Sequence, residues 1–237
     1  MYNNFIFDLY GTLIDIRTDD WSSEVWDKFA EWLTERGMKY TGKEVHELYD
    51  SCVKKAEAVP SVYEKAEIDI LPVFDTICRS KKADVSSEEV WEAGENFRII
   101  STSKIKLYPN TLKVLKALKD AGKKVYLLSN AQRVFTWQEL TGTGIVDYFD
   151  DIFISSDEGC KKPDVAFYKK LIDKHGLNIK ESVMIGNDST TDISGAAKLG
   201  MDAFYVRTAI SPENDPTPDC KYVFEDGDIG HVVELIK

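Results

Sequence analysis

Polar side chains that can do chemistry recur at one kind of position in this sequence, at or just after the end of a short apolar run. Runs such as NFIF, KVYLL and SVMIG have the length and composition of buried strands. In an open parallel sheet, ligands bind at the carboxyl ends of the strands, where the strand order reverses. The polar residues near these ends are Asp8, Ser129, Asn130, Lys162, Asp188 and Asp192. Their placement predicts one shared site.

Asp8 is the candidate nucleophile of this site. A carboxylate is a weak nucleophile, but a covalent intermediate on it divides one difficult displacement into two easier steps. The negative charge that develops on the transferred group needs preorganised hydrogen-bond donors. Suitable donors are the Lys162 ammonium, the Ser129 hydroxyl and the backbone N–H groups of residues 9–12, in the glycine-containing turn LYGTLID.

Structural interpretations of the same residues are open as well. Thr12 and Ser129 can be hydroxyls that stabilise turns, and Asp192 can cap the helix that follows it. Lys162 taken alone would be interpreted as a solvated charge. The catalytic interpretation is favoured because the whole set follows strand ends in order along the chain.

Helical segments separate the predicted strands. Residues 109–122 place Leu112, Leu115 and Leu118 on one face and stop at a glycine, and a second helix is expected within 163–176. Alternating strands and helices imply right-handed crossovers and a parallel sheet with helices on both faces. The predicted strands are residues 4–8, 124–129, 151–155, 182–186 and 202–206.

A long stretch after the first motif breaks this alternation. In WSSEVWDKFAEWLTERG, Trp21, Val25, Phe29 and Leu33 recur every four residues, as on one face of a helix. Four of the five tryptophans lie in this stretch, which predicts the aromatic-rich core of a small helical domain. The predicted α/β core comprises residues 1–16 and 101–237, and the predicted helical insertion comprises residues 17–100.

The composition limits the partners of the chain. Its 237 residues carry a formal net charge of −11. A field of that sign repels phosphate backbones and anionic surfaces, so neither nucleic acid nor a membrane is expected as a partner. No apolar run approaches the ~20 residues of a membrane span, and MYNNFIFD lacks the features of a signal peptide, so we expect a cytoplasmic protein. The four cysteines are scattered without a C-x-x-C pair, which favours free thiols.

Together these residues resemble the four-motif signature of the haloacid dehalogenase (HAD) superfamily. The resemblance covers residues 1–14 and about 108–206, with the insertion where that family has a helical cap. It implies a Rossmann-like parallel sheet and a hydrolase whose nucleophile is Asp8, with Tyr10 and Thr12 beside it in the catalytic set. It further implies that the transferred group is bound by Ser129, Asn130 and Lys162. The Mg²⁺ ligands that it implies are the carboxylate of Asp8, the backbone carbonyl of Tyr10 and Asp188, with Asp192 in support.

The superfamily includes Mg²⁺-dependent phosphatases and metal-free 2-haloacid dehalogenases, and this sequence resembles each in part. Phosphatases of the family normally carry a second aspartate two residues after the nucleophile, where this chain has Tyr10 in a dehalogenase-like D-L-Y-G-T. The six-residue step from Lys162 to Tyr168 is also dehalogenase-like. The fourth motif is phosphatase-like, because Asp188 and Asp192 keep a D-x-x-x-D spacing where dehalogenases have a Ser-Asn pair before the final aspartate.

Electrostatics favours a metal in this site. Two like charges about 4 Å apart repel by ~4 kcal/mol at an effective dielectric constant of about 20. Asp8, Asp188 and Asp192 would converge with only Lys162 to offset them, and a hard divalent cation removes this imbalance. We therefore predict a Mg²⁺-dependent phosphatase that acts on a small, soluble, anionic organic phosphate through an aspartyl-phosphate. The alternatives are a metal-free 2-haloacid dehalogenase with an Asp8 ester, and a non-catalytic binder of a phosphorylated ligand. The sequence does not indicate the oligomeric state.

Overall fold

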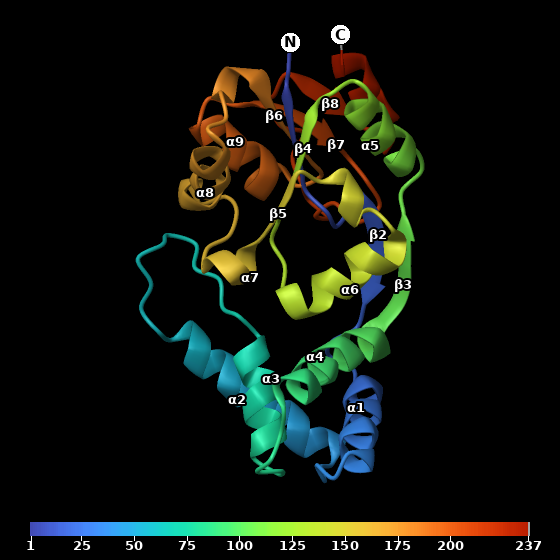
Figure 1. Ribbon diagram of the computed structural model, residues 1–237, viewed down its shortest axis with the longest axis vertical. Helices are drawn as coiled ribbons and strands as arrows, with labels where there is room; N and C mark the ends of the chain where they lie inside the picture. The colour runs from blue at the N-terminus through green and yellow to red at the C-terminus, as the bar shows by residue number, and fades with distance from the viewer. Residues whose placement is uncertain (237) are drawn as a thin grey trace.

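The computed structural model describes residues 1–236 and has two lobes, an α/β core and a helical insertion (Figure 1). The two lobes are joined by the antiparallel strands β2 (Ile14–Thr18) and β3 (Thr102–Leu107), which the sequence did not predict. Their burial is uneven and their composition polar, so neither shows the apolar run by which the core strands were identified.

The core contains a six-stranded sheet with the order β5-β4-β1-β6-β7-β8, and all of its neighbouring strands are parallel. The predicted α/β class and all five predicted strands are confirmed, while β8 was not predicted. The strands are β1 Asn4–Phe7, β4 Lys124–Ser129, β5 Asp151–Ile154, β6 Ser182–Gly186, β7 Asp202–Val206 and β8 Tyr222–Phe224.

The strand order reverses beside β1, and this reversal positions the site. From β1 the chain moves to β4 and β5 on one side of the sheet, and then crosses to β6 on the other side. Phe7, the last residue of β1, pairs with Leu127 of β4 and with Ile185 of β6. The loops that follow β1, β4 and β6 therefore meet at one edge, where a crevice forms in sheets of this kind.

Helices cover both faces of the sheet. Alternate β1 residues point to opposite sides, and the apolar side chains on each side are buried against helices. Phe5 and Phe7 pack in the cluster that contains α5, and Ile6 packs in the cluster that contains α8 and α9. In α5 the buried face includes Val114 rather than Leu112, which is 46% exposed, so the prediction for Leu112 is wrong. The core helices are α5 Thr111–Asp120, α6 Arg133–Thr143, α7 Ser155–Glu158, α8 Val165–His175 and α9 Ser194–Lys198, with short turns at Val146–Tyr148, Ile179–Glu181, Ser189–Ile193 and Ile229–Ile236.

The insertion consists of helices with a separate aromatic core. Phe29, Phe74 and Phe97 are fully buried in it together with Trp26. Trp21 is not part of this core, because Ser22 caps the helix and leaves Trp21 before it, 78% exposed. The four helices are α1 Ser23–Glu35, α2 Gly42–Glu57, α3 Leu71–Arg79 and α4 Ser87–Ser101.

The structure adds two observations on the wider sequence predictions. Within residues 1–236, no helix is both long and apolar enough to cross a membrane. Cys52, Cys78, Cys160 and Cys220 are all free thiols, as predicted. Burial raises the pKa of the Cys160 thiol to about 11, which disfavours its reactive thiolate form at neutral pH.

The packing of α9 against α8 gives a testable prediction for stability. A Cβ atom on Gly195 would lie 2.4 Å from the ring of the fully buried Tyr168. We expect Gly195→Ala to lower the free energy of unfolding by about 1–3 kcal/mol through overpacking, measured by urea denaturation. Gly142→Ala in α6 is the matched control, because a Cβ there has open space, and it should stabilise by about 0.5–1 kcal/mol. Equal effects of the two substitutions would contradict the prediction.

Candidate active site

The Lys162 ammonium lies between two carboxylates at the carboxyl end of the sheet. Its Nζ is 2.6 Å from Oδ1 of Asp8, which follows β1, and 2.7 Å from Oδ1 of Asp192, which follows β6. Lys162 reaches this position from the loop between α7 and α8, and it is only 2% exposed. The structure thus brings together three of the predicted site residues.

The charges of this group are not balanced, because one ammonium faces two carboxylates. Burial alone would lower the pKa of Lys162, but the Asp192 and Asp8 charges outweigh it and the pKa is raised, so the side chain stays protonated. Burial raises the pKa of Asp192 to about 7 against the opposing effect of Lys162, and the Asp8 charge contributes to the rise. Two carboxylates therefore share one ammonium, and the buried site relieves part of its negative charge by holding a proton on Asp192 near neutral pH.

Asn187, which was not predicted as a site residue, holds the turn after Asp8. The Thr12 hydroxyl lies 3.2 Å from Oδ2 of Asp8 and 3.2 Å from Oδ1 of the buried Asn187. Gly11 has φ +88°, and a Cβ on it would lie 2.1 Å from the Asn187 amide nitrogen. Only glycine fits there, so the glycine of the first motif is explained by the close approach of Asn187.

Ser129 and Asn130 follow β4 and differ in their contacts. Ser129 is fully buried, and its hydroxyl has no hydrogen-bond partner within residues 1–236. The Asn130 side chain is engaged, because it accepts from the Lys162 N–H at 2.8 Å and donates to the Lys162 carbonyl at 3.0 Å. Asn130, predicted to bind the transferred group, thus fixes the backbone of Lys162, while the buried Ser129 hydroxyl is left without a partner among residues 1–236.

Asp192 orders the loop after β6. Its Oδ2 accepts the N–H groups of Asn187 and Asp188, each at 3.1 Å, so both of its oxygens are in contact with protein groups. The Tyr168 hydroxyl donates to the Asp192 carbonyl at 2.8 Å, on the π-helical turn Ser189–Ile193. Asp192 therefore orders the backbone of the loop after β6, and Tyr168 holds the turn that carries Asp192.

Asp188 and the carbonyl of Tyr10 are the remaining predicted metal ligands. Asp188 caps its own turn, since its Oδ1 accepts the N–H of Thr190 at 2.7 Å and that of Thr191 at 3.1 Å. The backbone hydrogen bonds of the turn after Asp8 use the carbonyls of Leu9 and Ile14, not that of Tyr10. In the part of the chain that the structure describes, no three His, Cys, Asp or Glu side chains form a ready metal cluster. A metal here would depend on carboxylate, backbone and water oxygens together.

The Tyr10 side chain points to residues outside the predicted set. Its hydroxyl lies 2.9 Å from Oγ1 of Thr136 and hydrogen-bonds the Glu139 carboxylate, both on α6. Burial, and then the Glu139 charge, raises the pKa of Tyr10. A phenol in this state is poorly suited to transfer a proton near neutral pH.

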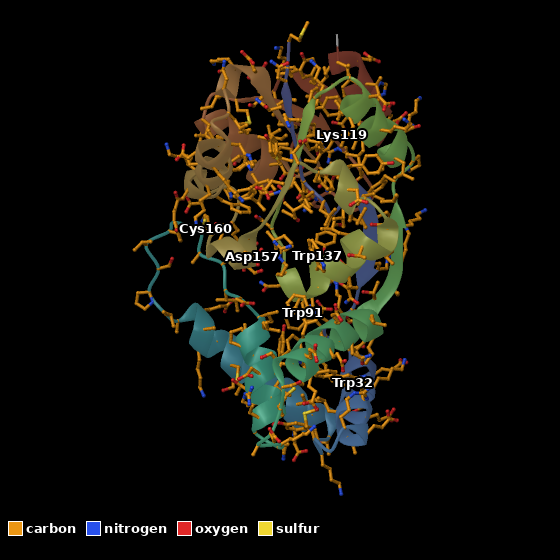
Figure 2. The ribbon with its side chains drawn as sticks, in the orientation of Figure 1. Trp32, Trp91, Lys119, Trp137, Asp157 and Cys160 are labelled. Atoms are coloured by element: carbon orange, nitrogen blue, oxygen red, sulfur yellow. The ribbon has the colours of Figure 1, made fainter. Side chains whose placement is uncertain are left out.

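The insertion contacts the loop that carries Lys162. Ala66 forms a β-bridge with Cys160, and the N–H of Glu67 donates to the Gly159 carbonyl at 3.1 Å. The Glu67 carboxylate accepts from the Ser155 hydroxyl at 3.0 Å. Figure 2 shows Cys160 beside this segment, where the chain runs from α2 toward α3. None of these three contacts has a local sequence signal, because each pairs backbone or polar groups that lie far apart in the chain.

Comparison with known proteins now identifies the family. Residues 2–200 match the profile described as haloacid dehalogenase-like hydrolase. The chain belongs to this family. The match covers both lobes and every motif described above, so the resemblance inferred from the sequence is confirmed.

Individual relatives in the HAD-like family include phosphatases. The chain is 32% identical to a glyceraldehyde 3-phosphate phosphatase of Methanothermobacter thermautotrophicus over 104 residues, which cover 44% of this chain and 46% of the relative. It is 24% identical to a phosphoserine phosphatase of Thermus thermophilus over 172 residues, or 70% and 69% of the two chains. The chain thus spans about half the length of the first of these curated relatives.

Solved structures support the fold. A 2-haloacid dehalogenase from Pseudomonas syringae pv. Tomato DC3000 superimposes with a TM-score of 0.63 at 19% identity, covering 100% of this chain and 98% of the other. At this identity the similarity concerns the HAD fold alone, and it does not favour dehalogenation over phosphate chemistry.

Ser129 gives a prediction that separates ligand binding from folding. Because its buried hydroxyl has no protein partner, Ser129→Ala should change the free energy of unfolding by less than ~0.5 kcal/mol. The same substitution should lower kcat/KM by about 100-fold, because a donor to the developing charge is lost.

Ser155→Ala provides the contrast. The Ser155 hydroxyl contacts Glu67 and accepts the N–H of Ala131 at 2.8 Å, so its loss should destabilise the protein by about 1–3 kcal/mol. A clearly destabilised Ser129→Ala with normal turnover would show that Ser129 has a structural role.

Proposed function

We propose that this protein hydrolyses small organic phosphate monoesters with Mg²⁺, through an aspartyl-phosphate on Asp8. The observation that carries the proposal is the excess of carboxylate over ammonium around Asp8, which a divalent cation would balance while binding a phosphoryl oxygen. The phosphatase names of the relatives support the same substrate class.

The first chemical step would use Asp8 as a nucleophile. Its carboxylate oxygen attacks phosphorus, a new O–P bond forms, and the bond from phosphorus to the leaving-group oxygen breaks. Lys162 and the unpartnered Ser129 hydroxyl would donate to the non-bridging phosphoryl oxygens. Water then hydrolyses the acyl-phosphate, releasing inorganic phosphate and restoring the Asp8 carboxylate.

Three oxygen groups of this chain suit a Mg²⁺ ion. They are the carboxylates of Asp8 and Asp188 and the backbone carbonyl of Tyr10, which would hold the ion together with water. The ion would supply Lewis-acid stabilisation of the phosphoryl oxygens. Asp192 would orient this group by holding the backbone at Asn187 and Asp188.

Two alternatives are kept as outcomes of the test. Tyr10, in the dehalogenase-like D-L-Y-G-T, is the sequence feature that favours a metal-free dehalogenase with an Asp8 ester. Binding of a phosphorylated ligand without turnover would use the same contacts. The Lys162-to-Tyr168 step resembles the dehalogenases, but the Tyr168 hydroxyl donates to backbone carbonyls of the π-helical turn. This contact argues against the dehalogenase.

A cytoplasmic location remains a prediction.

The test is a paired assay of p-nitrophenyl phosphate and 2-chloropropionate, each with Mg²⁺ and with EDTA. We expect hydrolysis of the phosphate only, lost in EDTA, abolished in Asp8→Asn and strongly reduced in Asp188→Ala. Asp15→Asn is the control, because Asp15 is equally buried in β2 but pairs with Lys104 and has no contact with the site. Turnover of the haloacid in EDTA would establish the dehalogenase, and phosphate binding without turnover would establish the binder.

The engaged state of Tyr10 predicts a strong dependence on the leaving group. General acid catalysis contributes about 10²–10⁴-fold, and Tyr10 cannot supply it while its hydroxyl donates to Glu139. The wild type should therefore cleave p-nitrophenyl phosphate far faster than glycerol 3-phosphate, because nitrophenolate leaves without a proton.

Tyr10→Asp, which places a carboxyl group at this position, should raise the ratio of kcat/KM for glycerol 3-phosphate to kcat/KM for p-nitrophenyl phosphate. Tyr10→Phe is the matched control and should leave the ratio between the two substrates unchanged. A wild-type enzyme that already prefers alkyl phosphates would refute the argument.

A further inference from the structure

An ion pair links the insertion to the core next to the nucleophile turn. Arg98 lies in the last turn of α4, in the insertion, and Glu139 lies on α6, in the core. Nε of Arg98 is 2.6 Å from Oε1 of Glu139, and the two side chains are only 11% and 5% exposed. Figure 1 shows α4 directly beside α6, and Figure 2 shows Trp91 and Trp137 of these helices in the same region between the lobes.

The pair extends to the residue two positions after Asp8. The Tyr10 hydroxyl donates to Glu139, and the Arg98 guanidinium lies 5.7 Å from the centre of the Tyr10 ring. Tyr10 directly precedes Gly11, whose N–H donates to Ile14 in the turn that presents Asp8. Arg98, Glu139 and Tyr10 therefore form a continuous contact from the insertion to the nucleophile turn.

Stability alone does not account for a pair of this kind. Taking two charges out of water is costly, and replacing a buried pair by apolar residues of similar size is often neutral or stabilising. Removing one partner is strongly destabilising, because the other charge is left buried and unpaired. The pair is better explained by what it fixes, namely the side chain of Tyr10 and the placement of α4 on α6.

We propose that Arg98 and Glu139 are positioning residues that make the geometry of the nucleophile turn depend on correct seating of the insertion. When α4 is seated on α6, Glu139 is held by Arg98 and fixes the Tyr10 hydroxyl, which restrains residues 9–14. When α4 moves away, this restraint is lost. The kinetic consequence rests on the hydrolase chemistry proposed above, whereas the restraint on the turn does not.

The test compares Arg98→Met, Glu139→Met and the double variant Arg98→Met/Glu139→Met with the wild type. Each single variant should lower both the melting temperature and kcat for p-nitrophenyl phosphate. In the double variant no charge is left unpaired, so the melting temperature should return to within about 3 °C of the wild type. Its kcat should stay about 100-fold low with little change in KM, because the phosphoryl group is bound by other residues while the nucleophile is misplaced.

Two further variants complete the kinetic test. Arg98→Lys keeps the charge and should recover kcat to within about 10-fold of the wild type. The matched control is Asp75→Met/Arg79→Met, which removes an ion pair that lies wholly within α3 of the insertion and should leave kcat unchanged. Recovery of kcat together with the melting temperature in Arg98→Met/Glu139→Met would mean that the pair is only structural, and would overturn the proposal.

Hydrogen exchange gives a readout that does not need turnover. The N–H groups of Gly11 and Leu13 donate within the turn, at 2.9 and 2.8 Å. Their exchange should be faster in Arg98→Met/Glu139→Met than in the wild type, and unchanged in Asp75→Met/Arg79→Met. A wild type that hydrolyses no phosphate would refute the proposed function but leave this measurement valid. Unchanged exchange at both amides would overturn the positioning role even if the enzyme is active.

Discussion

The site depends on one buried ammonium, that of Lys162, held between the carboxylates of Asp8 and Asp192. Burial acting alone would lower the pKa of this lysine, and the charges of the two carboxylates raise it instead. Each carboxylate in turn needs the lysine, because an unpaired buried charge is costly. The surrounding contacts hold the group rigid: Asn130 fixes the backbone of Lys162, and Tyr168 fixes the turn that carries Asp192. The imbalance of two carboxylates against one ammonium is the feature on which the proposed cation site rests.

The insertion is fastened to the core at the two loops that bring Asp8 and Lys162 together. The segment around Ala66 and Glu67 pairs with the loop before Lys162, and Arg98 contacts Glu139 beside the turn after Asp8. The fold therefore couples the insertion to both sides of the ion group. A small displacement of the insertion would change the positions of Asp8 and Lys162. Misplacement of reacting groups by about 1 Å can lower a rate about 100-fold.

Local sequence patterns predicted those parts of the structure that depend on local or continuous apolar signals. The five core strands were found because buried parallel strands are unbroken apolar runs, and the motif residues were found because they stand where those runs end. The prediction that Trp21 lies on a helix face is wrong, because Trp21 matches the helical period but precedes the Ser22 cap. Asn187 and Glu139 were missed for a different reason. Each is buried through polar contacts with residues more than a hundred positions away, and such pairs leave no periodicity in the sequence.

Tyr10 shows how the conflicting motifs can be reconciled. The sequence alone made its position a question of chemistry, because a phosphatase of this family normally has an acid there and this chain has a phenol. In the structure the phenol is directed at α6 and the insertion, where its hydroxyl is bound by Glu139. The residue at this position is therefore constrained by how the two lobes meet as well as by the reaction. A dehalogenase-like first motif then carries little information about the bond that is broken. The fourth motif, which sets the charge around Asp8, carries more, and for this reason the phosphatase assignment rests on the charge balance of the site rather than on the spelling of D-L-Y-G-T.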